Sequence, residues 1–335
     1  MRVAVVLLLA IIAGAQNLTP LGTHTTANLR GVSAPSNTVV WASGTGGTYL
    51  RTTDAGQTWT VSRVPGAEQL DFRDVEAFNE NVAYLLSAGP GAVSRIYKTN
   101  DGGSHWTLQL KNEDPRGFYD CMAFWDETHG IALGDSIDGE FQLFSTDDGE
   151  HWHQLPTNKL PTSLEGEGAF AASGSCIAVQ GQSNVWFATG GKIARVYRST
   201  DRGESWQVSD TALTHGLDST GIFSIAFRDA KHGVIAGGDY QKPKQSGHNL
   251  AFTEDGGETW TLSSLAPQAY YSAAAYRPGG LLLVGTAGAA LVTADSPTST
   301  RLLHFWNANL NAVSLPPDGT AYAVGPKGLI VRIPR

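Results

Sequence analysis

An eight-residue pattern, Ser/Thr-x-Asp-x-Gly-x-x-Trp, occurs five times along the chain. The copies begin at Thr52, Thr99, Ser145, Ser199 and Thr253. Their aspartates lie 46 to 54 residues apart and are Asp54, Asp101, Asp147, Asp201 and Asp255. Self-similarity at a fixed period indicates a repeat architecture, and a period of this length suits one blade of four antiparallel strands. The pattern therefore predicts an all-β propeller.

The chemistry of the repeated pattern, called the Asp box here, favours a structural role. An aspartate can accept backbone N–H groups across a tight turn, and the glycine two residues later can adopt a positive φ. We therefore expect each Asp box to hold the hairpin between the third and fourth strands of its blade. A single carboxylate per hairpin supplies too few oxygens for calcium, so the sequence predicts no metal site at the boxes.

Apolar strand pairs precede each box, and two further repeats keep the strands without the box. Seven blades are therefore expected within one domain, residues 16–335. Their approximate ranges are 28–63, 70–110, 117–157, 165–210, 220–264, 270–304 and 309–335. The last repeat ends before a fourth strand, so we expect residues 17–26 to close the ring and cover the open sheet edge.

The occurrence of one box per blade, in segments such as Arg51-Thr52-Thr53-Asp54-Ala55-Gly56, resembles the photosystem II stability and assembly factors and their bacterial relatives. The resemblance covers nearly the whole chain after its first residues. It implies an exported seven-bladed propeller that binds a membrane-protein client without catalysis.

The N-terminus has the composition of a secretory signal peptide. Arg2 precedes an unbroken apolar run from Val3 to Ile12, and the small residues Ala13-Gly14-Ala15 follow. The run is shorter than the roughly 20 residues of a membrane-spanning helix. We predict a signal peptide over residues 1–15, no membrane span, and a mature chain in the periplasm, in a lumen or outside the cell.

Export would place both cysteines, Cys121 and Cys176, in an oxidising compartment. A disulfide between neighbouring repeats is one outcome and two buried free thiols are the other, because the sequence does not give their Cα separation. The formal net charge of −8 argues against a nucleic-acid partner, which requires a basic surface.

Polar residues gather near the starts of the inner strands and in the loops between second and third strands, which share one face of a propeller. Ligands usually bind such a face. The binding candidates there are Arg30, Arg73, Asp135, Asp138, Arg195, Asp239, Tyr240, Lys242 and Tyr271. The candidates for acid–base or nucleophilic chemistry are Asp74, Asp120, Glu165, Glu167 and Tyr119.

Three functions fit this face. A non-catalytic surface for a protein client is the reading that the resemblance favours. An exo-acting, sialidase-like glycoside hydrolase would use two of the carboxyl groups as acid and nucleophile or base, with arginines holding an anionic sugar. A lectin-like carbohydrate binder would bind without turnover. The sequence contains no phosphate loop, dinucleotide fingerprint or zinc-ligand spacing, so we expect no cofactor.

Overall fold

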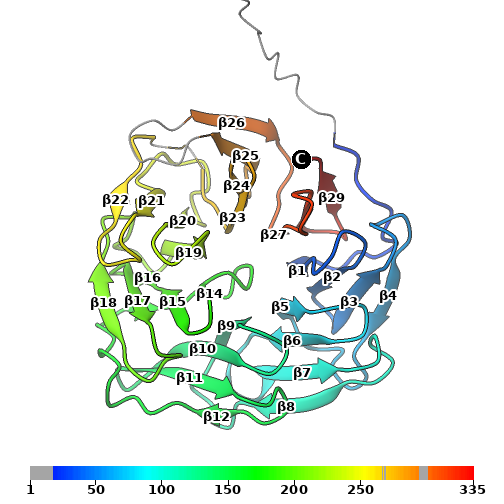
Figure 1. Ribbon diagram of the computed structural model, residues 1–335, viewed down its shortest axis with the longest axis horizontal. Helices are drawn as coiled ribbons and strands as arrows, with labels where there is room; N and C mark the ends of the chain where they lie inside the picture. Colours follow the sequence, from blue (N-terminus) through cyan, green and yellow to red (C-terminus); the bar gives the residue numbers. More distant parts are fainter. Residues whose placement is uncertain (1–17, 266, 268, 294–300) are drawn as a thin grey trace, which may run out of the picture.

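Seven antiparallel sheets are arranged radially around a central channel in the computed structural model (Figure 1). The structure describes residues 18–265, 267, 269–293 and 301–335. The predicted all-β, seven-bladed propeller is confirmed. The predicted signal peptide, residues 1–15, lies outside the described residues. Within those residues, no helix has the length and apolar content that crossing a membrane demands.

Blades one to three each contain four strands that follow one another from the channel outwards. Their bounds are β1 Leu29–Ser33, β2 Val40–Gly44, β3 Thr48–Thr52, β4 Thr60–Arg63, β5 Phe72–Ala77, β6 Ala83–Ser87, β7 Arg95–Thr99, β8 Thr107–Lys111, β9 Tyr119–Phe124, β10 Gly130–Ile137, β11 Glu140–Thr146 and β12 His153–Gln154. A short 3-10 helix, η1 Gly91–Val93, precedes β7.

Blades four to seven follow the same scheme with local changes. Blade four comprises β14 Ile177–Gln180, β15 Asn184–Ala188, β17 Arg195–Ser199 and β18 Gln207–Asp210. Blade five comprises β19 Thr220–Phe227, β20 Gly233–Asp239, β21 Leu250–Thr253 and β22 Thr261–Leu262. Blade six comprises β23 Ala273–Arg277, β24 Gly280–Gly285, β25 Gly288–Thr293 and β26 Arg301–Trp306, and blade seven β27 Ala312–Ser314, β28 Ala321–Val324 and β29 Ile330–Ile333.

Burial decreases from the inner to the outer strands. Every residue of β2 and β6 is buried, because neighbouring blades cover both faces of these apolar second strands. The outer strands β4 and β12 are largely exposed, and their sequences are correspondingly polar. The core is therefore a ring of apolar layers between blades, which leaves the channel and its loops to polar residues.

Side-chain oxygens connect the inner strands of successive blades. Ser33 Oγ accepts the Ala77 N–H at 3.1 Å, and Asp74 Oδ2 accepts the Met122 N–H at 2.8 Å. Backbone N–H groups at the inner edge of a blade would otherwise lack partners. These contacts hold neighbouring blades in register around the channel.

Both ends of the described chain meet at blade seven, which has three strands in the described residues. Pro20 forms an isolated antiparallel bridge with Val331, and the Leu21 N–H donates to the Ile330 carbonyl at 2.8 Å. Leu18 is buried in the apolar layer between blades six and seven. The N-terminal segment therefore lies along the outer edge of β29.

The Asp boxes form tight hairpins between third and fourth strands. In the first box, Thr52 Oγ1 donates to Asp54 Oδ1 at 2.7 Å and accepts the Gly56 N–H at 3.0 Å. Asp54 Oδ1 also accepts the Thr58 N–H at 2.9 Å. Donation from Thr58 lowers the pKa of Asp54 to about 2, so this aspartate stays ionised at neutral pH.

The third box differs from the prediction by one residue. Thr146 and Asp148 make the contacts expected of Ser145 and Asp147, and Asp148 Oδ1 accepts the His151 N–H at 2.8 Å. The other four hairpins contain two consecutive residues with positive φ, as at Ala55 and Gly56, whereas this turn has a single one at Gly149. The turn is one residue shorter, so the aspartate that fits it is the second of the pair.

This difference predicts unequal effects of two neighbouring substitutions. Asp148→Ala removes the acceptor for the His151 N–H and should lower the midpoint of thermal unfolding by roughly 2 °C. Asp147→Ala should leave the midpoint within about 1 °C of the wild-type value. Differential scanning calorimetry of the two variants measures both midpoints. Equal losses would contradict the assignment of Asp148 to the turn.

Blade four also departs from the predicted register. The predicted range of this blade begins at residue 165, but its inner strand is β14, which begins at Ile177. Residues Glu167–Gly168 instead form a two-residue strand, β13, that pairs with β16, Gly190–Gly191. Gly190 pairs in turn with Gly221 of blade five, where a Cβ on Gly190 would lie 2.7 Å from the Gly221 Cα. Glycine at both positions allows this close approach, and the following residues 169–176 cross to the channel.

Candidate functional site

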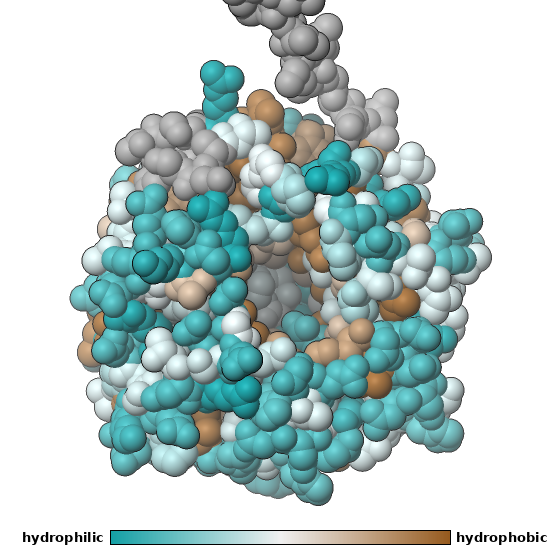
Figure 2. Space-filling model, in the orientation of Figure 1, coloured by the Kyte–Doolittle hydropathy of each residue, from teal (hydrophilic) through white to brown (hydrophobic). Residues whose placement is uncertain are grey.

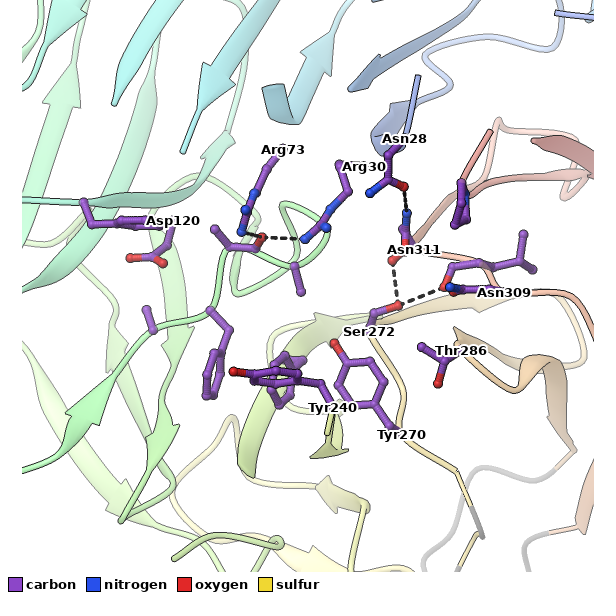
Figure 3. A pocket seen from close by; sticks show the side chains of 18 of the residues that line it. Asn28, Arg30, Arg73, Asp120, Tyr240, Tyr270, Ser272, Thr286, Asn309 and Asn311 are labelled. Atoms are coloured by element: carbon purple, nitrogen blue, oxygen red, sulfur yellow. Dashed lines mark hydrogen bonds between the residues drawn. The ribbon is translucent and has the colours of Figure 1, made fainter. Parts of the chain in front are cut away.

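A cavity of about 540 Å³ opens at the mouth of the channel. Figure 2 shows the hollow at the centre of the molecule, and Figure 3 shows the side chains around it. Blades one, two, three, five, six and seven contribute to this channel-mouth cavity, together with the segment 169–172 that leads into blade four. Its polar and aromatic lining residues include Asn28, Arg30, Arg73, Asp120, Asp135, Phe170, Phe223, Tyr240, Tyr270, Ser272, Thr286 and Asn311.

β-Bulges place four of these side chains. Where each of β1, β5, β9 and β19 pairs with the second strand of its blade, one extra residue interrupts the register. Bulges redirect the extra residue relative to its neighbours in the strand. The four extra residues all line the cavity and are Arg30, Arg73, Asp120 and Phe223.

The two arginines converge on one backbone carbonyl. Arg30 Nη2 and Arg73 Nη1 donate to the Ala171 carbonyl at 3.3 Å and 3.2 Å (Figure 3). Arg73 Nε also pairs with Asp71 at 2.8 Å, whereas Arg30 Nε is buried without a partner. Burial lowers the pKa of Arg30, and the neighbouring Arg73 lowers it further. Around this carbonyl two guanidinium groups share one carboxylate, Asp71, so an anionic group would be stabilised there.

Aromatic rings form the facing wall of the cavity. Phe170 stacks on Phe223 with 3.9 Å between ring centroids, and Tyr270 meets Phe223 edge-on at 4.8 Å. Tyr240 lies at the rim, where 47% of its surface is exposed. This wall offers an apolar surface beside the guanidinium groups, as peptide-binding and other ligand pockets commonly do.

Two carboxyl groups occupy a third part of the lining. Asp135 Oδ1 accepts the Ala169 N–H at 2.9 Å. Asp120 is 1% exposed, and its Oδ2 atom has no hydrogen-bond partner. Burial raises the pKa of Asp120 well above its usual value, and Asp135 raises it further. Burial likewise raises the pKa of Asp135.

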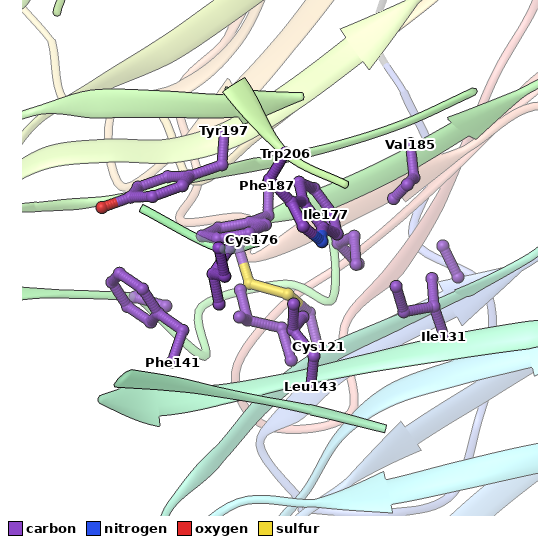
Figure 4. Close-up of a cluster of buried hydrophobic side chains, with 14 residues drawn as sticks. Cys121, Ile131, Phe141, Leu143, Cys176, Ile177, Val185, Phe187, Tyr197 and Trp206 are labelled. Atoms are coloured by element: carbon purple, nitrogen blue, oxygen red, sulfur yellow. A yellow bond between two sulfur atoms is a disulfide. The ribbon is translucent and has the colours of Figure 1, made fainter. Parts of the chain in front are cut away.

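The segment that carries the Ala171 carbonyl is fixed by a disulfide. Cys121 in β9 and Cys176, directly before β14, are bonded with a Cα separation of 6.0 Å (Figure 4). Both cysteines are fully buried in the apolar layer between blades three and four. Gly174, two residues before Cys176, packs against the Asp74 carboxylate. The covalent link therefore positions one wall of the cavity.

Glu167 and Arg195 form a buried ion pair beside the cavity. Arg195 Nε donates to Glu167 Oε1 at 3.0 Å, and the side chains are 8% and 0% exposed. Glu167 also accepts from the Thr189 hydroxyl at 2.7 Å and from the Leu164 N–H at 2.9 Å. Both carboxylate oxygens of Glu167 already accept hydrogen bonds, so this side chain is not available for acid–base chemistry. The pair connects β13 to blade four.

Other residues proposed from the sequence point away from the cavity. Tyr119 and Tyr271 are buried in apolar layers, at 2% and 1% exposure. The expected register assigned Tyr119 to the rim, but the bulge makes its neighbour Asp120 the residue that faces the cavity. Asp74 is buried between blades two and three, where it binds the Met122 N–H.

The remaining candidates lie elsewhere on the same face. Glu165 is 95% exposed and pairs with Lys192. Asp138, at the turn between β10 and β11, is 80% exposed and pairs with Arg116. Asp239 and Lys242 line a separate cavity of about 290 Å³.

Three features of the cavity were absent from the sequence analysis: the Ala171 carbonyl, the Phe170–Phe223 stack and Tyr270. Phe223 had a usable signal, because it occupies the same strand position as Arg30, Arg73 and Asp120. The described residues contain no group of three or more histidine, cysteine, aspartate or glutamate side chains that could hold a metal ion.

No protein-family model matches the chain. Two cyanobacterial proteins are similar in sequence. The photosystem II assembly lipoprotein Ycf48 of Synechococcus sp. (strain CC9902) is 28% identical over 200 residues, which is 59% of this chain and about half, 52%, of that relative. The photosystem II assembly protein Ycf48 of Synechococcus sp. (strain JA-2-3B'a(2-13)) is 24% identical over 301 residues, 77% of this chain and 83% of the relative.

Among solved structures, YCF48 bound to a D1 peptide superimposes with a TM-score of 0.66 and 17% identity. The superposition covers 95% of this chain and 96% of that one, and at this identity it establishes the fold. The sequence matches and the seven blades together confirm the resemblance first seen in the Asp-box rhythm: the chain is a β-propeller similar to the photosystem II assembly factors.

Proposed function

We propose that the chain is an exported, non-catalytic assembly or stability factor that binds an extended segment of a protein client in the channel-mouth cavity. The convergence of Arg30 and Arg73 beside the aromatic wall carries this proposal. Guanidinium groups bind carboxylates strongly, and the rings give an apolar side chain a surface to pack on. The client segment accordingly contains an acidic group next to an apolar residue.

The placement of the acids supports binding over hydrolysis. A glycoside hydrolase needs two carboxyl groups that flank one scissile bond. Glu167 is occupied by Arg195, Glu165 extends into solvent, and Asp74 is enclosed between blades. Asp120 is the one candidate acid among these that lines the channel-mouth cavity, where its neighbour Asp135 accepts the Ala169 N–H, and we assign no catalytic residue.

Export and the nature of the client rest on similarity. One relative is named a photosystem II assembly lipoprotein, and a related propeller was solved with a D1 peptide. By analogy, this chain acts outside the cytoplasm on a membrane-protein segment. The buried disulfide is consistent with an oxidising compartment.

Synthetic peptides that tile the D1 protein provide the first probe. We expect at least one tile to bind the purified chain in isothermal titration calorimetry, because the fold and the cavity suit a peptide. The double variant R30A/R73A should weaken that binding at least about tenfold, since it removes two charge-assisted donors. Arg63→Ala, an exposed arginine on the outer strand β4, is the matched control and should leave affinity unchanged.

Two results would contradict the proposal. The first is that no tile binds, or that the tiles bind the R30A/R73A variant as tightly as the wild type. The second is turnover of a glycoside in a broad substrate panel, which would make the chain an enzyme. Binding of free oligosaccharides without turnover would instead identify a lectin.

A further inference from the structure

We propose that the channel-mouth cavity recognises a second group of the client segment, a lysine-type ammonium, through the carboxyl group of Asp120. This inference rests on the proposed function and specifies its ligand: a segment that carries an acidic and a basic side chain close together. Arg30 and Arg73 would take the acidic side chain and Asp120 the basic one.

Asp120 has one carboxylate oxygen without a hydrogen bond, although the backbone N–H groups of Ala171 and Asp135 stabilise its ionised form. Glu167 accepts from Arg195, Thr189 and Leu164, and Asp239 accepts the Gln241 N–H at 2.9 Å. Asp120 Oδ2 has no partner, although the residue is 1% exposed. A buried polar atom without a hydrogen bond destabilises the fold. Such an atom at the wall of a cavity indicates a binding contact that a ligand completes.

The local backbone directs this carboxyl group. Asp120 is the extra residue of the bulge in β9 and lines the cavity, and Figure 3 shows it on the far side of Arg73 from Arg30. The same type of bulge directs Arg30 and Arg73 into the cavity from blades one and two. Three consecutive blades therefore present two guanidinium groups and then a carboxyl group along one arc of the mouth.

The charges around Asp120 favour a cationic ligand over a neutral donor. Asp135 on β10 and Arg73 on β5 are the charged groups that act on it. Arg73 is already shared between Asp71 and the Ala171 carbonyl, and it forms no ion pair with Asp120. Two carboxyl groups thus share one part of the lining, and a ligand ammonium would relieve their mutual repulsion.

Proton release gives this recognition a distinct signature. Burial and Asp135 raise the pKa of Asp120 well above its usual value in the empty cavity, which favours the protonated form of this carboxyl group. An ammonium beside the carboxyl group stabilises its ionised form and lowers its pKa. Binding of a lysine-containing segment at pH 7 should therefore release protons, whereas binding of an uncharged analogue should not.

The test uses short capped peptides of known composition. One series places a glutamate and a lysine in an alanine and leucine background, separated by zero to three residues, and a matched series replaces the lysine by methionine. We expect one lysine peptide to bind the wild-type chain about tenfold more tightly than its methionine match, with proton release measured by calorimetry in buffers of different ionisation enthalpy. Asp120→Asn should remove both the preference and the proton release, while Asp239→Asn, at an acid outside the channel-mouth cavity, should retain both.

Thermal unfolding supplies a readout without any ligand. A raised pKa in the folded chain means that the destabilisation from Asp120 is absent below about pH 4 and grows as the pH rises toward the folded pKa. Asp120→Asn should accordingly raise the melting midpoint at pH 8 and leave it unchanged at pH 4. A lower midpoint at pH 8 would identify Asp120 as a stabilising residue and overturn the inference.

The binding outcomes separate this inference from the proposed function. Equal affinity of the wild type for the lysine and methionine series would overturn the ammonium site and leave client binding intact. Failure of both series to bind would also overturn it, because the stated ligand class would be wrong. Binding of the D1 peptides to the wild type and to the R30A/R73A variant tests the proposed function independently of the lysine and methionine peptides.

Discussion

Removing the disulfide by the double substitution C121S/C176S is expected to lower the free energy of unfolding by about 4 kcal/mol. The bond joins residues 55 positions apart, and a cross-link over a loop of that length restricts the unfolded chain by about this amount. The variant should also weaken client binding, because residues 169–172 lose a covalent anchor beside the Ala171 carbonyl. Urea unfolding of the variant and the wild type under oxidising conditions measures the difference.

A second double variant separates the cross-link from the new hydroxyl groups. Both cysteines are fully buried, so serine also introduces polar atoms into an apolar layer. C121A/C176A leaves the layer apolar, and its free energy of unfolding should still fall by most of the amount expected for C121S/C176S. A loss below about 1 kcal/mol in the alanine variant would mean that the surrounding packing, and not the bond, holds the segment.

Removing only one residue of the Glu167–Arg195 pair should lower the free energy of unfolding about as much as removing the disulfide. Arg195→Met leaves the Glu167 carboxylate at 0% exposure without its cation, and such losses typically amount to about 3–5 kcal/mol. The double variant E167L/R195M removes both charges, so it should be more stable than R195M alone. Chemical denaturation of the wild type, the two single variants and the double variant gives the coupling between the residues.

Additive losses across that cycle would contradict the ion-pair interpretation. The pair also fixes β13 next to the cavity, so R195M should weaken peptide binding although Arg195 does not line the channel-mouth cavity. Arg198→Met supplies a control within the same strand, because Arg198 pairs with Glu258 at the surface, where the partner is 58% exposed. Its effect on stability should stay below about 1 kcal/mol.

The fold was accessible from the sequence because the Asp boxes are local. Each box needs only its own turn, so the threonine, aspartate, glycine and tryptophan at fixed spacing report a hairpin wherever they occur. Repetition at one period then predicts the blades. The third box shows the limit of this reasoning: two adjacent aspartates satisfy the pattern, and the length of the turn selects Asp148 over Asp147.

The site was less accessible because it depends on bulges and on backbone groups. A shift of one residue exchanges a core position for a cavity position, which is why both Tyr119 and Asp120 were expected at the rim although Tyr119 is buried. The Ala171 carbonyl has no signature in the sequence. Its position is set by the path of residues 169–176 across to the channel. That path depends on contacts between residues distant in the chain, such as Gly190 with Gly221.

The meeting of both chain ends in blade seven has a practical consequence. Pro20 lies against Val331, so the first and last described residues leave the molecule at the same outer corner (Figure 1). The channel-mouth cavity is central, and neither end contributes to its lining. A dye, an affinity tag or a surface attachment at Arg335 therefore leaves the mouth open, and single molecules can be immobilised through it for binding measurements.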